Sequence, residues 1–268
     1  MMKHLRYSLL ILLIALLQIS CENDESDISE PDYLELELIK DCLEYMNMPR
    51  PEGSYNYPVY PGMKAWADFT STPDMVEACQ VPTEVLEKQS TQAVIQAIWE
   101  YPFFYEVMLD YGKYQRAYDN IFLTNNAHKE LIKRDDAGIR LFQRYILVEP
   151  CLDGVTILPR TLEVMISQEY FLSQLTLDDK IALMKTVFEK ENEREKRGIT
   201  LSATTNATYL LMGRIMQNSG YKPFTDETAV NIVLSRFLKT SMPEVYSMEE
   251  YYTLMNIIID NAKNFTTE

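Results

Sequence analysis

The 268 residues of this chain include 40 acidic and 25 basic side chains, giving a formal net charge of −15 at pH 7, and 47% of them are hydrophobic. This balance excludes nucleic-acid binding, which needs clustered Lys and Arg, because here the basic residues alternate with acids. The clearest case is 189–197 (EKENEREKR), which we expect to be a solvated helix face with i,i+4 ion pairs. The hydrophobic content excludes general disorder and suffices for one large domain or two small ones.

The first twenty residues have the pattern of a secretory signal peptide. Lys3 and Arg6 provide a positive start, and residues 9–17 (LLILLIALL) form an uninterrupted apolar run. A membrane-spanning helix requires about 20 apolar residues, roughly twice this run, so a permanent transmembrane helix is disfavoured. Removing residues 1–20 takes away two basic and no acidic residues, which leaves 23 basic against 40 acidic residues and a net charge of −17.

Cys21 is the expected lipidation site. The preceding residues suit a lipobox, the Leu-x-x-Cys type of signal at which the cysteine is diacylated, although Gln18 stands where a large aliphatic residue is usual. Ordinary secretion fits less well, because an ordinary cleavage site after Ser20 would require a small residue in place of Gln18. Relaxed lipoboxes of this kind resemble those of Bacteroidetes, where an acidic cluster such as 22–25 (ENDE) implies export to the cell surface. We therefore expect residues 21–29 to form a lipidated acidic tether; the alternative is a structural cysteine after an uncleaved segment.

Three further cysteines, Cys42, Cys79 and Cys151, follow the lipidation site. Their odd number and the absence of a CxxC spacing favour neither a zinc site nor a disulfide framework. Two interpretations stay open: one disulfide, or buried thiols that act as small hydrophobic side chains.

The first half of the chain, 30–150, predicts a series of short helices. An i,i+4 apolar stripe indicates a helix over 34–46, and a connector rich in Pro and Tyr follows at 47–63. Start signals then recur at Thr72-Pro73, Val81-Pro82 and Ser90-Thr91, and two more helical pieces cover 127–132 and 137–146.

The second half, 151–268, predicts longer helices and is either a second subdomain or part of the same domain. The helical period is lost over 149–160, our candidate for an internal boundary. Capping residues at Thr176, Thr225 and Ser247 mark three helix starts, and the Ser247 start, with Glu250, has the pattern of a capping box. Glycines that follow helical patterns at 198 and 220 indicate C-terminal caps. Because no segment shows sustained strand alternation, the fold class is all-α, a multi-helix bundle or an irregular helical array.

A segment in the first half resembles exported lipoproteins of Bacteroidetes whose activity is not known. The matching residues are Asp74-Met75, Gln80-Val81-Pro82, Leu86, Ser90-Thr91, Tyr101-Pro102 and 130–138 (ELIKRDDAG). The resemblance covers about a third of the chain, and it implies an exported helical fold without implying a reaction.

Catalytic motifs are not evident in the sequence. His128 is the only histidine left after signal removal, and its position in NNAHKEL predicts a surface residue at a helix start. A Ser or Cys nucleophile also lacks a G-x-S-x-G or similar setting. No glycine loop suits a phosphate, and no loop of the EF-hand type suits a metal. We therefore assign no catalytic, metal or cofactor-binding residue.

Three adjacent carboxylate pairs, Asp135-Asp136, Asp178-Asp179 and Glu249-Glu250, could in principle serve acid/base chemistry. Neighbouring residues on a helix diverge by about 100°, however, and each pair falls at an expected helix start, where carboxylates favour the helix dipole. Capping is the favoured interpretation.

Aromatic residues concentrate at 101–118 (YPFFYEVMLDYGKYQRAY), with Tyr111, Tyr114 and Tyr118 at i,i+3,i+7. Exposed tyrosines at this spacing could stack on sugar rings, but the same spacing is the usual way in which a helix fills a core. We favour the core interpretation.

These observations predict a lipid-anchored envelope protein, at the outer membrane and exposed on the cell surface, with a non-enzymatic binding or scaffolding role. Its expected contacts are the membrane, through the lipid, and an envelope protein or glycan. The alternative is a carboxylate-based hydrolase, acting on glycans, whose acids come from distant helices.

Overall fold

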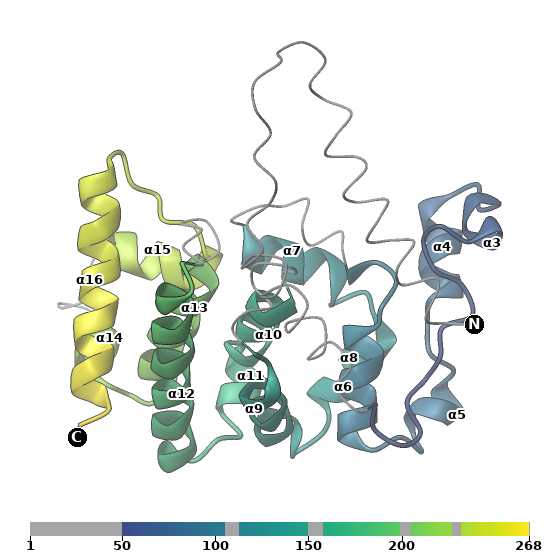
Figure 1. The fold of residues 1–268 in the computed structure, drawn as a ribbon, viewed down its shortest axis with the longest axis horizontal. Helices are drawn as coiled ribbons and strands as arrows, with labels where there is room; N and C mark the ends of the chain where they lie inside the picture. The colour runs from purple at the N-terminus through teal and green to yellow at the C-terminus, as the bar shows by residue number, and fades with distance from the viewer. Residues whose placement is uncertain (1–49, 105–112, 150–157, 199–204, 227–231, 268) are drawn as a thin grey trace, which may run out of the picture. The chain divides into compact units, whose positions relative to one another are not determined.

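The computed structural model of the protein describes residues 50–104, 113–149, 158–198, 205–226 and 232–267, and these ranges contain helices and no strand. The all-α prediction is therefore confirmed for the described residues (Figure 1). The helix expected over 34–46, the tether 21–29 and most of the expected boundary at 149–160 lie outside the described residues.

Short helices make up the first part of the described chain, as the frequent start signals predict. They are α3 (Lys64–Ala67), α4 (Thr72–Ala78), α5 (Thr83–Leu86), α6 (Thr91–Trp99), α7 (Tyr114–Ile121), α8 (Asn126–Ile132) and α9 (Ala137–Leu147). The second part contains the longer helices. It comprises α10 (Leu158–Ile166), α11 (Glu169–Leu172), α12 (Leu177–Lys196), α13 (Thr205–Asn218), α14 (Lys222–Thr225), α15 (Ile232–Thr240) and α16 (Met248–Phe265).

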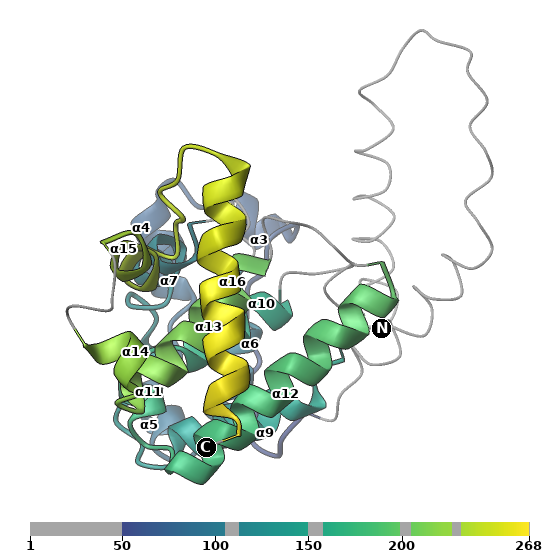
Figure 2. The same cartoon turned by 90° about the vertical axis from the view of Figure 1, so that its left-hand side faces the viewer.

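Helix α13 is central to the packing of the second part. It packs against α10 on one side and α16 on the other, as Figures 1 and 2 show, and it also contacts α11, α12, α14 and α15. In the first part, α6 packs against α8 and α9. The described residues belong to one compact unit, and one hydrophobic core extends through them from Tyr57 to Phe265.

Local capping explains where several helices begin. The hydroxyls of Ser71 and Ser90 accept hydrogen bonds from the backbone N–H groups of Asp74 and Ala93, as their sequence positions predict. Thr176 and Asp179 form a complete capping box at the start of α12. Past the helix ends, Gly198 and Gly220 adopt φ values of 68° and 71°, which confirms both as C-terminal caps.

Two expected caps differ in the structure. Thr225 does not begin a helix: it is the last residue of α14, a single turn that starts at Lys222 with Tyr221 as its N-cap residue. Its hydroxyl donates to the Tyr221 carbonyl oxygen. Ser247 caps α16, but the Glu250 carboxylate accepts from the N–H of Tyr246, one residue earlier than a capping box requires.

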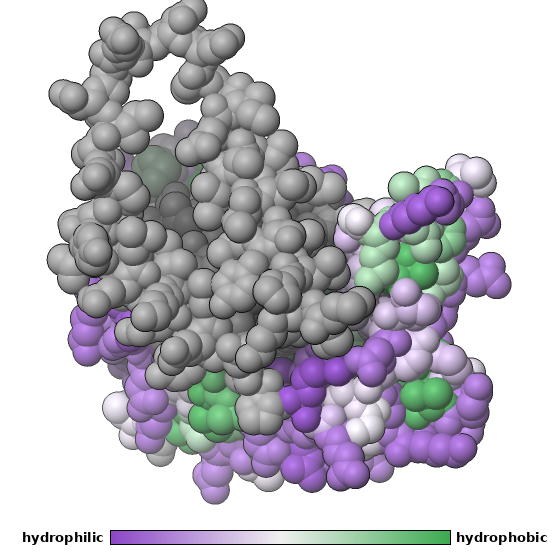
Figure 3. All heavy atoms as spheres, turned by 45° about the vertical axis from the view of Figure 1, so that its right-hand side comes forward, coloured by the Kyte–Doolittle hydropathy of each residue, from purple (hydrophilic) through white to green (hydrophobic). Residues whose placement is uncertain are grey.

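The face in Figure 3 is mainly hydrophilic where residues are described, and several small hydrophobic patches interrupt it. The described helices include none whose length and hydropathy suit a membrane span.

Candidate functional site

A buried ion cluster surrounds Glu163 on α10. Its carboxylate accepts hydrogen bonds from Tyr145 Oη at 2.7 Å, Thr208 Oγ1 at 2.8 Å and Arg194 Nη2 at 3.0 Å. Arg160 lies 3.3 Å from the same carboxylate, and all five side chains are fully or almost fully buried. The cluster therefore links α9, α10, α12 and α13 at a position that solvent does not reach.

The two guanidinium groups keep Glu163 ionised. Burial by itself raises the pKa of this carboxyl, but Arg194, Arg160 and the hydroxyl donors lower it, so that the pKa lies well below its usual range. A buried carboxylate with this many partners is a structural link between helices, because removing either arginine would leave buried charge poorly compensated and removing either hydroxyl would leave a buried acceptor without its donor.

Arg194 corrects the expectation that 189–197 is a solvated helix face. Arg197 and Glu193 do form the expected i,i+4 pair at 2.9 Å, but Arg194 is completely buried and Lys190 is 8% exposed. Leu183, Val187, Lys190 and Arg194 follow i,i+4,i+7,i+11, so the two cations continue the apolar stripe of α12 into the core. This i,i+4,i+7,i+11 spacing is the sequence signal that indicates burial of Lys190 and Arg194.

His128 corrects the expectation of a surface histidine. The residue does lie in the first turn of a helix, α8, which Asn125 caps. Its side chain, however, is completely buried. Its ring packs against the rings of Tyr118, Phe122, Tyr170 and Phe171. Burial among these rings lowers the pKa of His128 to about 4, so the imidazole is neutral at pH 7.

The His128 ring begins a chain of polar contacts that ends near the surface. Its Nε2 lies 2.5 Å from Tyr118 Oη, which in turn contacts Tyr170 Oη. Nearby, Arg214 donates to Gln115 Oε1 at 2.7 Å and to the Leu238 carbonyl oxygen at 2.8 Å. These contacts join α7 to α8, α11 and α13, and α13 to α15.

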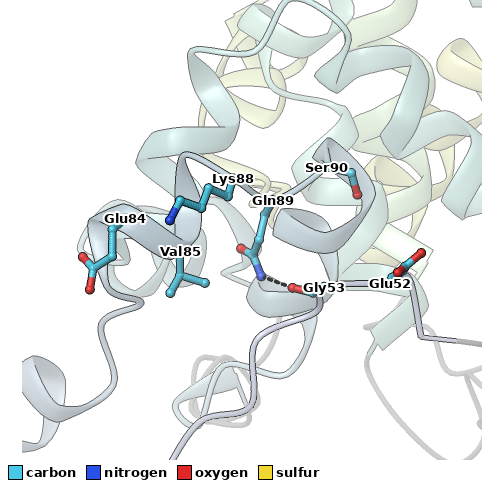
Figure 4. Close-up of a pocket in the computed structure, with 7 residues that line it drawn as sticks. All are labelled: Glu52, Gly53, Glu84, Val85, Lys88, Gln89 and Ser90. Atoms are coloured by element: carbon cyan, nitrogen blue, oxygen red, sulfur yellow. Dashed lines mark hydrogen bonds between the residues drawn. The ribbon is translucent and has the colours of Figure 1, made fainter.

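The accessible candidate is a pocket of about 260 Å³ beside α5 (Figure 4). Its lining residues come from the connector before α3, from α5 and from the turn between α5 and α6, and they are Glu52, Gly53, Glu84, Val85, Lys88, Gln89 and Ser90. Its volume lies just below the range of ~300–1,000 Å³ that is typical of small-molecule sites. It is therefore a shallow surface depression, and most of its lining residues are exposed.

Gln89 is the buried polar residue of this pocket. It is 7% exposed, and its Nε2 donates to the Gly53 carbonyl oxygen at 2.8 Å, which joins the connector to α5. Its Oε1 is buried and has no hydrogen-bond partner among the described residues. An unsatisfied buried acceptor costs about 1–3 kcal/mol, so this side-chain orientation lowers stability locally.

Arg134 fixes the wall that carries Gln89. Its guanidinium donates to the carbonyl oxygens of Gln89 at 2.6 Å and Leu86 at 2.8 Å, and it pairs with Glu130 at 3.3 Å. The turn between α8 and α9, in the 130–138 segment, therefore caps the end of α5. No sequence signal distinguished Gln89, because its burial depends on this contact across 45 positions.

The expected carboxylate pairs do not converge. Asp136 is the N-cap residue of α9, whereas Asp178-Asp179 and Glu249-Glu250 lie in the first turns of α12 and α16. The positions of the pairs in α12 and α16 agree with the capping interpretation, whereas Asp136 makes no side-chain cap hydrogen bond and its carboxylate accepts from Thr91 and Arg140. The pocket contains none of these residues.

The remaining candidates belong to the core. In the aromatic segment, Tyr101, Phe103, Phe104, Tyr114 and Tyr118 are buried, which confirms the core interpretation for the described part of 101–118.

Cys79 is a buried free thiol, as one of the two cysteine interpretations predicts, and burial raises its pKa to about 11. Cys21, Cys42, Cys151 and Tyr111 lie outside the described residues. Within the described residues, no group of three or more His, Cys, Asp or Glu could hold a metal ion.

No protein-family model, curated protein or solved structure matches this chain.

Proposed function

We propose that this protein is a lipid-anchored envelope protein, attached through Cys21 at the outer membrane and exposed on the cell surface, whose helical unit binds a ligand. The observation that carries the anchoring is the sequence of positive start, short apolar run, cysteine and acidic tether within 1–29. Two or three acyl chains on one cysteine give stable attachment, whereas a single chain binds membranes only marginally.

The pocket beside α5 supports a binding role for the helical unit. It is lined by the amide residue Gln89 and by a half-buried apolar side chain, Val85. Exposed charges from Lys88 and Glu84 surround them. A few oriented polar groups beside an apolar contact are typical of small-ligand sites.

The second candidate is a carboxylate-based hydrolase, and the observation that favours it is the presence of Glu52 and Glu84 at one pocket. Paired-carboxylate hydrolysis requires two acids that face one bond from opposite sides at a separation of about 5–10 Å. Figure 4 shows Glu52 and Glu84 on opposite sides of the pocket with their carboxylates turned away from one another, an arrangement that favours binding over catalysis. Hydrolysis of a polysaccharide that Glu84→Gln abolishes would establish the hydrolase instead.

Intact mass spectrometry of the protein isolated from membranes tests the anchor. We expect a chain that begins at Cys21 and carries two or three acyl groups. Cys21→Ser should prevent both the added mass and membrane retention, whereas the matched variant Cys42→Ser should change neither. An unmodified N-terminus in the wild-type protein would contradict the proposal.

Protease treatment of whole cells tests surface exposure. Digestion of the helical unit on intact cells is the expected result. Protection on intact cells, with digestion only after the outer membrane is permeabilised, would place the protein on the inner side of that membrane.

A further inference from the structure

We infer that helix α3 and its flanking residues rest on the lipid surface that holds the anchor, with Trp66 at the level of the lipid headgroups. This inference rests on the proposed lipid anchor and adds a second contact between the protein and the membrane. The juxtaposition that carries it is an apolar turn without buried residues, 63–69, directly after the connector through which the anchored N-terminal segment enters the folded unit.

The turn 63–69, which we call the α3 patch, is apolar but is not buried. Helix α3 has no buried residue, although three of its four residues are apolar. Ala65 and Ala67 are exposed, and Met63, Trp66 and Phe69 are half-buried. Figure 3 shows hydrophobic residues over the α3 and α4 region, at the upper right of the view. The described part of the fold therefore does not cover this apolar turn.

The Trp66 ring is held at the outer edge of the core. Its centroid lies 5.2 Å from that of the Phe103 ring and 6.1 Å from that of the Phe69 ring, which it meets edge-on. Because Phe103 is buried and Trp66 only half-buried, one part of the indole packs on the core and another part stays accessible. Tryptophan is enriched at membrane–water interfaces, where its apolar ring and its N–H group both find suitable surroundings.

The anchored segment joins the folded unit close to the α3 patch. Arg50, at the start of the described chain, donates to the Glu100 carboxylate at 2.7 Å. Phe103, which contacts the Trp66 ring, lies three residues after Glu100. The chain from the lipid therefore reaches the protein on the side where Trp66 lies.

The lipid keeps this side near the membrane. The segment 22–49 spans at most about 100 Å even when it is fully extended. A contact that would be weak for a free protein then forms at the high effective concentration that a tether provides.

Charge also favours this part of the surface. The chain after residue 20 has a net charge of −17, whereas 53–67 contains no acid and one basic residue, Lys64. Lysine beside aromatic and apolar side chains is typical of segments that lie in the membrane interface. Asp68 and Asp74 follow and are exposed, so we expect the patch to lie among the headgroups and not in the hydrocarbon.

A second copy of the chain fits the α3 patch less well than a lipid surface does. Three half-buried side chains and two alanines offer roughly 300 Å² at most, whereas each partner in a stable protein interface contributes about 800 Å². A lipid surface requires no such area, because the acyl chains on Cys21 already supply most of the attachment.

Fluorescence quenching in vesicles tests the inference. The chain has two tryptophans, so Trp99→Phe leaves Trp66 as the single reporter and Trp66→Phe leaves Trp99 as the matched control. The lipidated protein is reconstituted into phosphatidylcholine vesicles with or without brominated acyl chains. We expect brominated lipid to remove most of the Trp66 emission and soluble acrylamide to remove little of it. Trp99, which the Arg144 guanidinium covers, should keep its emission in brominated lipid.

A surface substitution tests the patch itself. Ala65→Asp adds an acid at an exposed position in the first turn of a helix, where the helix dipole favours it, so we expect the fold to be unchanged. With Trp66 as the single reporter, this variant should lose most of the quenching by brominated lipid. Ala182→Asp, at an exposed position on α12, is the matched control and should be quenched as before.

Three results would overturn the inference. The first is Trp66 emission that brominated lipid leaves intact, whether acrylamide quenches it, which would show contact with water, or does not, which would show cover by protein. The second is equal quenching of Trp66 and Trp99, and the third is unchanged quenching in Ala65→Asp. Intact mass and co-flotation with vesicles report on the anchor irrespective of Trp66. An anchored protein with unquenched Trp66 would therefore contradict this inference alone, whereas a chain without lipid would contradict both proposals.

Discussion

Acidification should destabilise this protein through His128. Its pKa is about 4 in the folded chain, because the ring is buried among four aromatic rings, against about 6.5 when it is exposed. Between these values the unfolded chain binds a proton that the folded chain does not, so stability is lost as pH falls from 6.5 to 4. A difference of this size corresponds to about 3 kcal/mol of the free energy of unfolding.

Urea denaturation at a series of pH values measures this loss. Glu163 contributes in a lower window, because its pKa is depressed and its stabilisation disappears only as pH falls below the usual range of a free carboxyl group. The interval from pH 6.5 to 5 therefore reports mainly on histidine. Since the chain has two histidines and His4 belongs to the expected signal peptide, the folded unit has a single candidate.

The variant His128→Phe isolates the effect. It keeps an aromatic ring in the core and leaves the Tyr118 hydroxyl its contact with Tyr170. We expect the pH dependence between 6.5 and 5 to flatten in this variant, and the imidazole signals of the wild type to titrate near pH 4. An unchanged slope in His128→Phe, or an imidazole that titrates near 6.5, would refute the reasoning.

Three further substitutions test the packing, each by urea denaturation at pH 7. Arg194→Met should lower the free energy of unfolding by about 3–5 kcal/mol, because Glu163 loses a buried partner. Gly138→Ala should cost about 2 kcal/mol, more than Gly213→Ala, because the added methyl group would lie 2.4 Å from a backbone oxygen at 138 but beside a movable leucine side chain at 213. Thr176→Ala should cost about 1 kcal/mol through loss of the capping box at the start of α12.

Matched controls accompany these substitutions. Arg197→Met removes only a partly exposed i,i+4 pair and should change stability by less than about 0.5 kcal/mol. Thr253→Ala lies on the exposed face of α16 and should be nearly neutral. Equal losses for Arg194→Met and Arg197→Met would contradict a buried role for Arg194, and a larger loss for Gly213→Ala than for Gly138→Ala would contradict the packing at α9.

Sequence alone determined the features that depend on neighbouring residues. Helix starts at Ser71, Ser90 and Thr176 were predictable because a cap and its N–H partner lie three positions apart. The same reasoning predicted that the acidic pairs of α12 and α16 lie at helix starts, because a carboxylate interacts favourably with the helix dipole only within the first turn. The all-α class follows from the sum of these local signals.

Only the tertiary structure decided which polar groups are buried. Arg194 meets Glu163 across 31 positions, and His128 on α8 packs against the rings of Tyr170 and Phe171 on α11. Gln89 becomes a buried acceptor only because Gly53 and Arg134, 36 and 45 positions away, take its amide nitrogen and its backbone carbonyl oxygen. Burial is set by the segments that pack on a residue, and no pattern within one helix specifies which distant segments those are.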